Sequence, residues 1–250
     1  MSSGMTLIPL GVGDAFSALH YSSCMALEAE GSVLLVDCPH PIMKMMREAG
    51  LAAGAPLTAD RVAAVVLTHL HADHCSGLED LAYYFHYTLS RTLPVLAHPA
   101  VAERLWDGHL AAGMELVSTG SGRAPQKKKF TDFFRLIELS DKHAASFGPF
   151  SVECRRTEHH VPTTALRVTG AGRCLGHSAD TSFDPSLIEW LARADLVLHE
   201  TGPGIHTPYE KLAALPAAVR GKMKLTHFSD AFDGKASVIE PLRQGQRYSV

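Results

Sequence analysis

Four potential metal ligands occur within six residues of the sequence, in the run Thr68-His-Leu-His-Ala-Asp-His74. His69 and His71 are two positions apart, so an extended backbone would point both side chains to the same side. A turn after His71 would bring Asp73 and His74 back toward a neighbouring position. A single zinc ion takes three or four N, S or O ligands, and this run offers more than one ion needs. The spacing therefore indicates two metal ions side by side. The alternative is a polar loop that caps the next helix.

The pattern His-x-His-x-Asp-His after a strand resembles the signature of the metallo-β-lactamase superfamily of metal-dependent hydrolases. Four further motifs follow the order that this resemblance implies, and the resemblance covers residues 5 to about 230. The motifs contain Asp37 (Leu34-Leu-Val-Asp37), His159 (Glu158-His-His-Val-Pro162), Asp180 (Gly176-His-Ser-Ala-Asp180) and His227 (Leu225-Thr-His-Phe228).

The resemblance implies that all of these motifs except that of Asp37 supply ligands to a pair of divalent ions. It places Asp37 behind the histidine loop as an orienting residue. The implied ligands are His69, His71 and His159 for one ion, Asp73, His74 and His227 for the other, and Asp180 as the bridge. Zinc is expected, although manganese and iron accept the same ligands. Two ions about 3.5–4 Å apart can share a water molecule and lower its pKa.

Two assignments stay open. His160 is an alternative to His159, because adjacent strand residues face opposite ways; the His-x-x-Pro spacing of the superfamily favours His159. Asp73 could also orient or deprotonate the attacking water, which would make it catalytic as well as a ligand. Cys75 lies beside the cluster, and a small buried residue is the better interpretation of it.

Three elements are similar to ribonuclease Z and its phosphodiesterase relatives: the opening loop 10–15, the run His199-Glu-Thr201, and the run Thr226-His-Phe-Ser229. The resemblance implies that His199 protonates the leaving oxygen and that Glu200 orients it. A histidine that merely satisfies a backbone carbonyl is the alternative. His206-Thr207 resembles a shortened substrate-side element of this group. No long Gly/Pro-rich arm of the kind that grips transfer RNA is visible, so transfer-RNA processing is not favoured.

Short apolar runs bounded by turn residues predict the strands that must position these motifs. The predicted strands are 5–10, 23–28, 33–37, 61–68, 93–97, 150–158, 164–169, 173–176, 195–199 and 223–226. Helices are expected over 43–49, from Leu78 with one apolar stripe, and from Pro185 behind an Asp184 N-cap. Residues 118–129 are predicted to be a mobile loop, and 105–150 as a whole has no clear pattern. We expect one α/β domain over residues 1–250, and the resemblance implies a four-layer αββα sandwich with two mixed sheets inside and helices outside.

The composition limits the function classes. The chain has 250 residues, is 46% hydrophobic and carries 23 basic against 26 acidic side chains, a net charge of −3. This excludes a disordered chain, and the charge provides no field that would collect nucleic acid or an anionic membrane. The five cysteines are an odd, scattered set that favours a reducing compartment, so we expect a cytoplasmic protein. No signal peptide and no transmembrane run are visible.

The sequence therefore predicts a hydrolase that uses a dinuclear metal centre on a phosphodiester, of a small or cyclic-nucleotide type. A small anionic substrate is expected, while nucleic acid is not favoured. A homodimer is common in the ribonuclease-like group and stays open. The alternatives are hydrolysis of a carboxylic ester, lactone, thioester or amide at the same centre, and a binding protein that has lost its metal.

Overall fold

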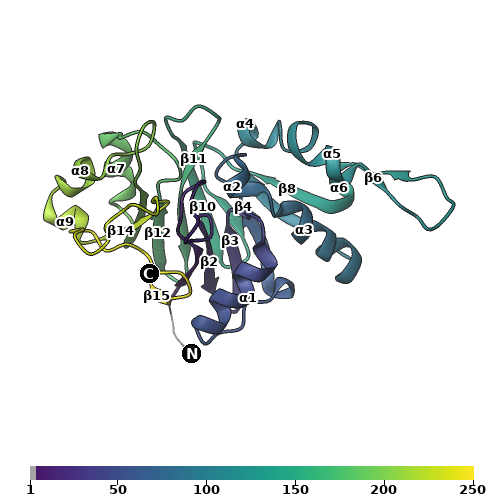
Figure 1. The fold of residues 1–250 in the computed structure, drawn as a ribbon, viewed down its shortest axis with the longest axis horizontal. Coiled ribbons are helices and arrows are strands. Elements are labelled where there is room, and N and C mark those ends of the chain that lie inside the picture. Colours follow the sequence, from purple (N-terminus) through teal and green to yellow (C-terminus); the bar gives the residue numbers. More distant parts are fainter. Residues whose placement is uncertain (1–3) are drawn as a thin grey trace.

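Residues 4–250 are described by a computed structural model, in which two mixed β-sheets lie face to face (Figure 1). The first sheet has the spatial order β15 (Tyr248–Ser249), β1 (Thr6–Gly11), β2 (Cys24–Ala29), β3 (Ser32–Val36), β4 (Val62–Val66), β5 (Leu93–Ala97) and β8 (Phe134–Glu138). The second has the order β14 (Met223–Thr226), β13 (Leu196–Glu200), β12 (Arg173–His177), β11 (Thr164–Gly170), β10 (Phe150–Arg156) and β9 (Ala145–Phe147). All the strands predicted from the sequence are present, with small shifts at their ends.

The helices of the described chain are short, and most connect one strand to the next. They are α1 (Ile42–Ala52), α2 (Ala72–Cys75), α3 (Leu78–Tyr83), α4 (Pro99–Ala102), α5 (Ala111–Met114), α6 (Phe130–Phe133), α7 (Pro185–Leu191), α8 (Tyr209–Ala213) and α9 (Ala217–Arg220). A π-helical turn, Tyr84–Thr88, extends α3. None of the helices in residues 4–250 has the length and apolar character that a membrane crossing requires.

Alternating side chains of the first sheet divide the core into two parts. Leu34 and Val36 of β3 pack toward the second sheet, against residues such as Leu166 and Leu198. Val33 and Leu35 of the same strand pack on the opposite face, among the side chains of α1 and α3. A strand that is buried on both faces reads as a continuous apolar run, which is why β3 and β4 could be recognised in the sequence.

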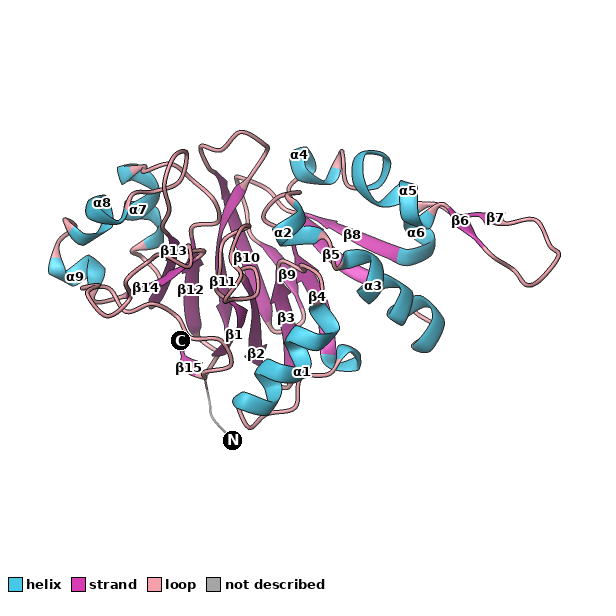
Figure 2. Cartoon of the chain, viewed as in Figure 1, coloured by secondary structure: helices cyan, strands magenta, loops and turns pink. Residues whose placement is uncertain are grey.

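Helices cover the outer faces of both sheets, as Figure 2 shows: α1 and α3 lie on one side of the pair and α7 to α9 on the other. Helix α7 approaches β12 at Gly176, where a Cβ atom would lie 3.2 Å from the Leu191 side chain. Asp184 caps α7 by accepting a hydrogen bond from the backbone N–H of Ser186, as predicted. The four-layer αββα architecture expected from the sequence is confirmed.

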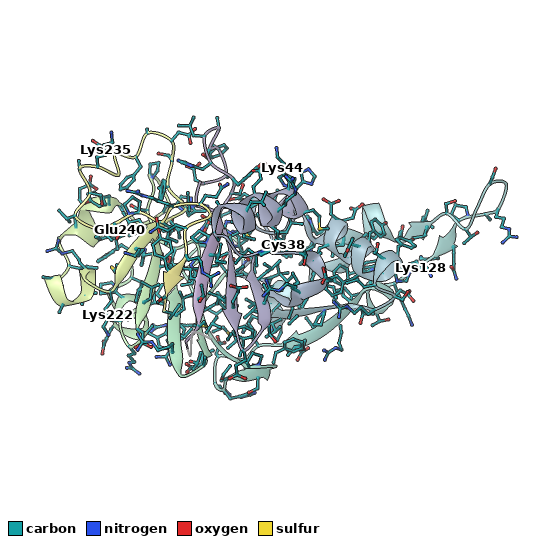
Figure 3. The ribbon with its side chains drawn as sticks, turned by 90° about the horizontal axis from the view of Figure 1, so that it is seen from below. Cys38, Lys44, Lys128, Lys222, Lys235 and Glu240 are labelled. Carbon is teal, nitrogen blue, oxygen red and sulfur yellow. The ribbon has the colours of Figure 1, made fainter. Side chains whose placement is uncertain are left out.

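The region 105–150 contains structure that the sequence did not predict. Strands β8 and β9 form edges of the two sheets. The predicted loop 118–129 is mostly exposed but carries a two-stranded hairpin, β6 (Leu116–Val117) with β7 (Gln126–Lys127), which extends from the body of the fold. Figure 3 shows Lys128 near the base of this extension, at the opposite end of the molecule from Lys222. These strands have two to five residues, too few for their own periodicity to define them, so their pairing partners do.

Candidate metal centre

The predicted site residues come from strand ends that meet at one edge of the two sheets. In the first sheet β3 and β4 are parallel neighbours, and Asp37 and His69 follow their carboxyl ends. In the second sheet β12, β13 and β14 are parallel neighbours, followed or ended by Asp180, Glu200 and His227. Parallel strands present their carboxyl ends on the same side, which is where sites of α/β proteins form. Residues almost 160 positions apart in the chain therefore become neighbours.

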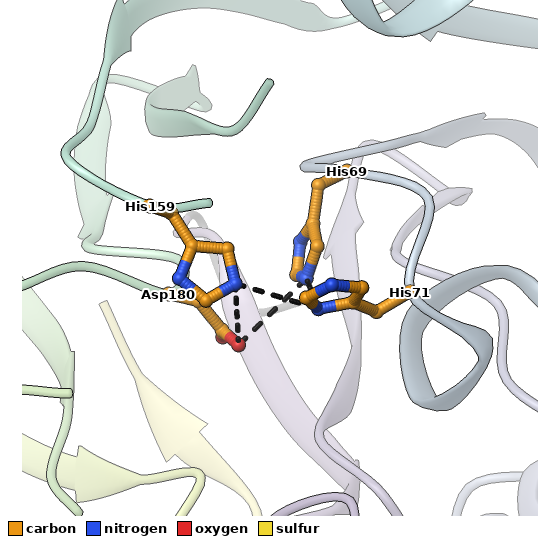
Figure 4. A group of neighbouring side chains, drawn as sticks. All are labelled: His69, His71, His159 and Asp180. Carbon is orange, nitrogen blue, oxygen red and sulfur yellow. Dashed lines mark hydrogen bonds and ion pairs between the residues drawn. The ribbon is translucent and has the colours of Figure 1, made fainter. Parts of the chain in front are cut away.

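The first group of ligand-type side chains consists of His69, His71, His159 and Asp180 (Figure 4). His69 Nε2 lies 3.0 Å from His71 Nδ1, and His159 Nε2 lies 3.4 Å from the same His71 atom. The Asp180 Oδ2 atom lies 3.7 Å from His69 Nε2 and 3.9 Å from His159 Nε2. Three imidazole nitrogens and one carboxylate oxygen thus converge on a single point.

The second group consists of Asp73, His74 and His227. Helix α2 begins directly after His71, and its first turn carries Asp73 and His74 back toward the strand ends. Asp73 Oδ2 lies 3.2 Å from His74 Nε2 and 3.3 Å from His227 Nε2. The Asp180 carboxylate is also close to this group, at 3.5 Å from both imidazoles. Asp180 therefore lies between the two groups.

Asp37 supports the histidine loop from behind. Its carboxylate accepts hydrogen bonds from the backbone N–H and the hydroxyl of Thr68 and from His74 Nδ1, each at 2.8 Å. The Thr68 hydroxyl also lies 2.9 Å from His69 Nδ1. These contacts leave the Nε2 atoms of both imidazoles directed at the centre, and they are the contacts that the predicted orienting role of Asp37 requires.

His159, not His160, enters the first group. The His159 side chain is buried beside Asp180, whereas His160 is exposed and its ring lies 4.6 Å from that of His71. Cys75 belongs to neither group formed by the described residues: it is buried, its Sγ lies 3.3 Å from His109 Nε2, and burial raises the pKa of its thiol to about 12.

Several residues around the centre have a left-handed backbone conformation, which L side chains rarely adopt. Asp37, Ala179 and His227 have φ values of 63°, 51° and 49°. Non-glycine residues in this region cost free energy and are held there by the surrounding structure. The contacts of Asp37 and the strand pairing around His227 provide that support.

The first group has the protonation that cation binding requires. Burial lowers the pKa of His69 and of His71, and lowers that of His159 to about 4. Their imidazoles are therefore neutral at neutral pH and offer lone pairs. Burial raises the pKa of Asp180, but the positive charge of His74 and His227 outweighs this effect and the pKa falls below its ordinary value. The three neutral imidazoles of this group and the ionised carboxylate of Asp180 together form a ligand set that suits a divalent cation.

The second group attracts positive charge. Burial lowers the pKa of His74, but the carboxylates of Asp180 and Asp37 outweigh burial, so the pKa lies above its ordinary value. His74 Nε2 is fully buried and makes no hydrogen bond of good geometry with any described residue, although carboxylate oxygens of Asp73 and Asp180 lie 3.2 and 3.5 Å from it. A cation bound between this nitrogen and the two carboxylates would satisfy all three groups. The residues of both groups thus fit divalent metal ions.

A third pair of residues lies beside the centre. Glu200 is fully buried; its Oε2 accepts a hydrogen bond from His206 Nδ1 at 2.7 Å, and its Oε1 accepts one from the backbone N–H of Thr181. Its hydrogen bond and charge raise the pKa of His206. His206 also forms a ligand-type group with Asp180 and His227.

His199 has a different environment from the one its predicted role requires. Its Nδ1–H donates to the backbone carbonyl of Glu200 at 2.8 Å, and the Glu200 side chain contacts His206 instead. Burial lowers the pKa of His199 to about 4, so the ring is neutral at neutral pH. Its role as proton donor stays a prediction, and the geometry provides a second candidate in His206.

A pocket of about 550 Å³ opens over the two groups. Its polar part is formed by the histidines and carboxylates of the centre, including Asp73, Asp180 and His227. Its remaining lining comes from the loop after β1 and the loop after β13, with Phe16 and Ile205 as the largest apolar side chains. This volume is within the range of small-molecule sites. None of the lysines 127–129 lines it.

Two pocket residues carry little signal in the sequence. His206 lies in the irregular run Gly202-Pro-Gly-Ile-His206, and Phe16 lies in a polar turn. Neither position belongs to a periodic element. The resemblance of His206-Thr207 to a substrate-side element was the one sequence signal for His206, and the contact of His206 with Glu200 and the folding of both loops over the centre place the two residues.

Comparison with known proteins identifies the family of the chain. The family model described as Anti-Pycsar protein Apyc1 matches residues 5–248. The chain belongs to the Apyc1 family. The Apyc1 protein of Saccharibacillus brassicae is 29% identical over 257 residues, which cover 98% of this chain and 100% of that protein.

Solved structures share the fold of this Apyc1 family member. The metallo-β-lactamase fold protein YhfI of Bacillus subtilis aligns with a TM-score of 0.76 and 20% identity, over 99% of this chain and 100% of YhfI. The short form of human tRNase Z aligns with a TM-score of 0.69 and 21% identity, over 98% of both chains. The predicted metallo-β-lactamase fold is confirmed. The chain is a metal-dependent hydrolase of the phosphodiesterase type.

Proposed function

We propose that the chain hydrolyses the cyclic phosphodiester of a nucleoside cyclic monophosphate, using two divalent ions, zinc by preference. The observation that carries this proposal is the position of the Asp180 carboxylate between two ligand groups that line one small-molecule pocket. Membership of the Apyc1 family supports the substrate class. The net charge of −3 and the pocket volume support a small anion over a long nucleic acid.

We assign the ligands as the structure groups them. His69, His71 and His159 would hold one ion, Asp73, His74 and His227 the other, and Asp180 both. Two ions held there would generate a nucleophile from water at neutral pH and stabilise the charge that develops on the phosphoryl oxygens. The protein's own contribution is orientation: Asp37 and Thr68 fix the direction of the histidine loop before any ligand binds.

The reaction also requires a proton for the leaving group. Hydrolysis forms a bond between the water oxygen and phosphorus and breaks one P–O ester bond, and the departing alkoxide takes up a proton. His206 lines the pocket and has Glu200 on its other side, which orients the ring and stabilises its protonated form. We therefore assign the proton donor to His206 and propose that Asp73 orients the water.

Metal analysis combined with paired assays tests this function. The purified chain is assayed with 3′,5′-cyclic AMP and 3′,5′-cyclic CMP, and separately with p-nitrophenyl acetate. We expect turnover of the cyclic nucleotides that a chelator abolishes and that added zinc or manganese restores. The product is identified as a nucleoside monophosphate by ³¹P NMR.

Two results would contradict the proposal. Metal-dependent turnover of the carboxylic ester alone would indicate carbonyl chemistry at the same centre. A protein with less than one ion per chain that gains no activity with added metal would be a binding protein instead.

A further inference from the structure

The side chain of Phe16 is 94% exposed, yet it lines the pocket over the metal centre. We propose that Phe16 is the platform on which the nucleobase of the substrate stacks. This inference rests on the proposed function, because it requires a substrate that carries a base. A large aromatic side chain that is left in water at a pocket mouth loses the free energy that burial would provide, and a stacked heteroaromatic ring would recover it.

The loop that carries Phe16 is held in place by a residue from the C-terminal part of the chain. The Asp230 carboxylate accepts hydrogen bonds from the backbone N–H groups of Ala18, at 2.7 Å, and Leu19, and also from the hydroxyl of Ser17. The Ser17 hydroxyl oxygen in turn accepts from the backbone N–H of His20 at 3.0 Å. A hydrogen bond from Ser17 and those from the backbone lower the pKa of Asp230, so the anchor is charged at neutral pH. Phe16 is therefore exposed on an ordered loop.

The same loop is tied to the metal centre through its base. The backbone N–H of Asp14 donates to the carbonyl of Phe228 at 3.1 Å, and Phe228 N–H donates to the carbonyl of Val12. Phe228 directly follows His227, a member of the second ligand group. At Gly13 the turn is so tight that a Cβ atom would lie 2.6 Å from Ser17 Cβ. The position of Phe16 relative to the centre is thus set by backbone contacts and not by chance packing.

The distribution of polarity in the pocket decides which part of a substrate meets Phe16. The imidazoles and carboxylates of the centre would take the phosphate, so the opposite part of the molecule must lie against the remaining lining. Among the described pocket residues, that lining consists of apolar residues such as Phe16 and Ile205 together with the carboxylate of Asp14, and Phe16 is its only aromatic carbocycle. Aromatic side chains bind bases by stacking on their faces, with a substantial effect per base.

The experiment compares a cyclic nucleotide with the same substrate lacking its base. 3′,5′-Cyclic AMP and the 3′,5′-cyclic phosphate of 1-deoxyribose are hydrolysed under identical conditions by the metal-loaded enzyme. We expect Phe16→Ala to lower the ratio of kcat/KM for the two substrates by about tenfold, mainly through KM for cyclic AMP. Phe16→Tyr should restore the ratio. Leu19→Ala, at a 74% exposed position of the same loop outside the pocket lining, is the matched control and should keep it.

A second measurement does not depend on turnover. Binding of 5′-AMP, measured by calorimetry, should weaken by about tenfold in Phe16→Ala relative to the Leu19→Ala control. Asp230→Asn should shift the kinetic ratio in the same direction, because it weakens the anchor of the loop.

The outcomes separate the two proposals. A wild-type enzyme that hydrolyses both substrates, with a Phe16→Ala ratio equal to that of Leu19→Ala, would overturn the stacking role alone. A change in oligomeric state of Phe16→Ala with an unchanged ratio would also overturn it, and would assign the exposed ring to a protein contact. A metal-loaded wild type that hydrolyses no cyclic nucleotide would overturn the proposed function and this inference together.

Discussion

Asp180 is the residue on which both ligand groups converge, since its two oxygens lie within 3.9 Å of four imidazole nitrogens. Replacing it by Asn keeps the shape but removes the anionic charge. We expect Asp180→Asn to lower kcat/KM for cyclic AMP by at least about a thousandfold, because charge stabilisation by bound metal is worth several kcal/mol. Bound metal, measured by inductively coupled plasma spectrometry, should fall as well. Asp107→Asn, at an exposed position, is the control; equal losses in both variants would contradict the role of Asp180.

Two substrates whose leaving groups differ in basicity can show whether His206 or His199 is the proton donor. A proton donor contributes about 10²–10⁴-fold, but only where the departing oxygen needs the proton. We expect His206→Asn to lose activity in that range with cyclic AMP and far less with methyl p-nitrophenyl phosphate, whose p-nitrophenolate leaves unprotonated. His199→Asn should show no such discrimination. The reverse pattern would restore His199 as the donor.

At the scale of elements, Asp37 joins the end of β3 to the loop after β4 through three hydrogen bonds. In Asp37→Asn one oxygen becomes an N–H donor, which cannot accept from His74 Nδ1–H. Outer partners of metal ligands typically contribute 10–100-fold to affinity. We therefore expect metal affinity, measured by competition with a chromophoric chelator, to fall within that range. An unchanged affinity would show that the loop is held by its own packing.

Helix α7 belongs to the outer helical layer, and the contribution of this layer to stability can be measured by removing the N-cap of the helix. Asp184 caps its first turn, and the helix covers β12, the strand that leads to Asp180. We expect Asp184→Ala to lower the free energy of unfolding by about 1 kcal/mol, measured by urea denaturation. Glu189→Ala, at an exposed position on the same helix, is the control and should change the stability less.

For the whole molecule, buried neutral histidines make the fold sensitive to acid. The pKa of His199 is lowered by burial to about 4, whereas the unfolded chain takes up this proton below about pH 6.5. Between these values the unfolded state binds more protons, so the free energy of unfolding falls as the pH decreases. We expect His199 to account for a loss of about 2 kcal/mol between pH 7.5 and pH 5. Urea denaturation in the presence of a chelator measures this loss, and His199→Asn should show a flatter pH profile; identical profiles would contradict it.

The sequence by itself determined the superfamily, the ligand-type residues and the strands that carry them. It could do so because β3 and β4 are buried on both faces, which gives continuous apolar segments in the sequence, and because the segment Thr68–His74 contains four ligand-type side chains. The partner of Glu200 and the position of Phe16 were decided only by the tertiary structure, which also groups His159, the residue that the His-x-x-Pro spacing favoured, with Asp180. Each depends on contacts between segments distant in the chain: Glu200 meets His206 across an irregular loop, and Asp230 holds a loop more than 200 residues before it. Local periodicity shows which face of a helix or strand is buried. It does not show which distant residues pack against that face.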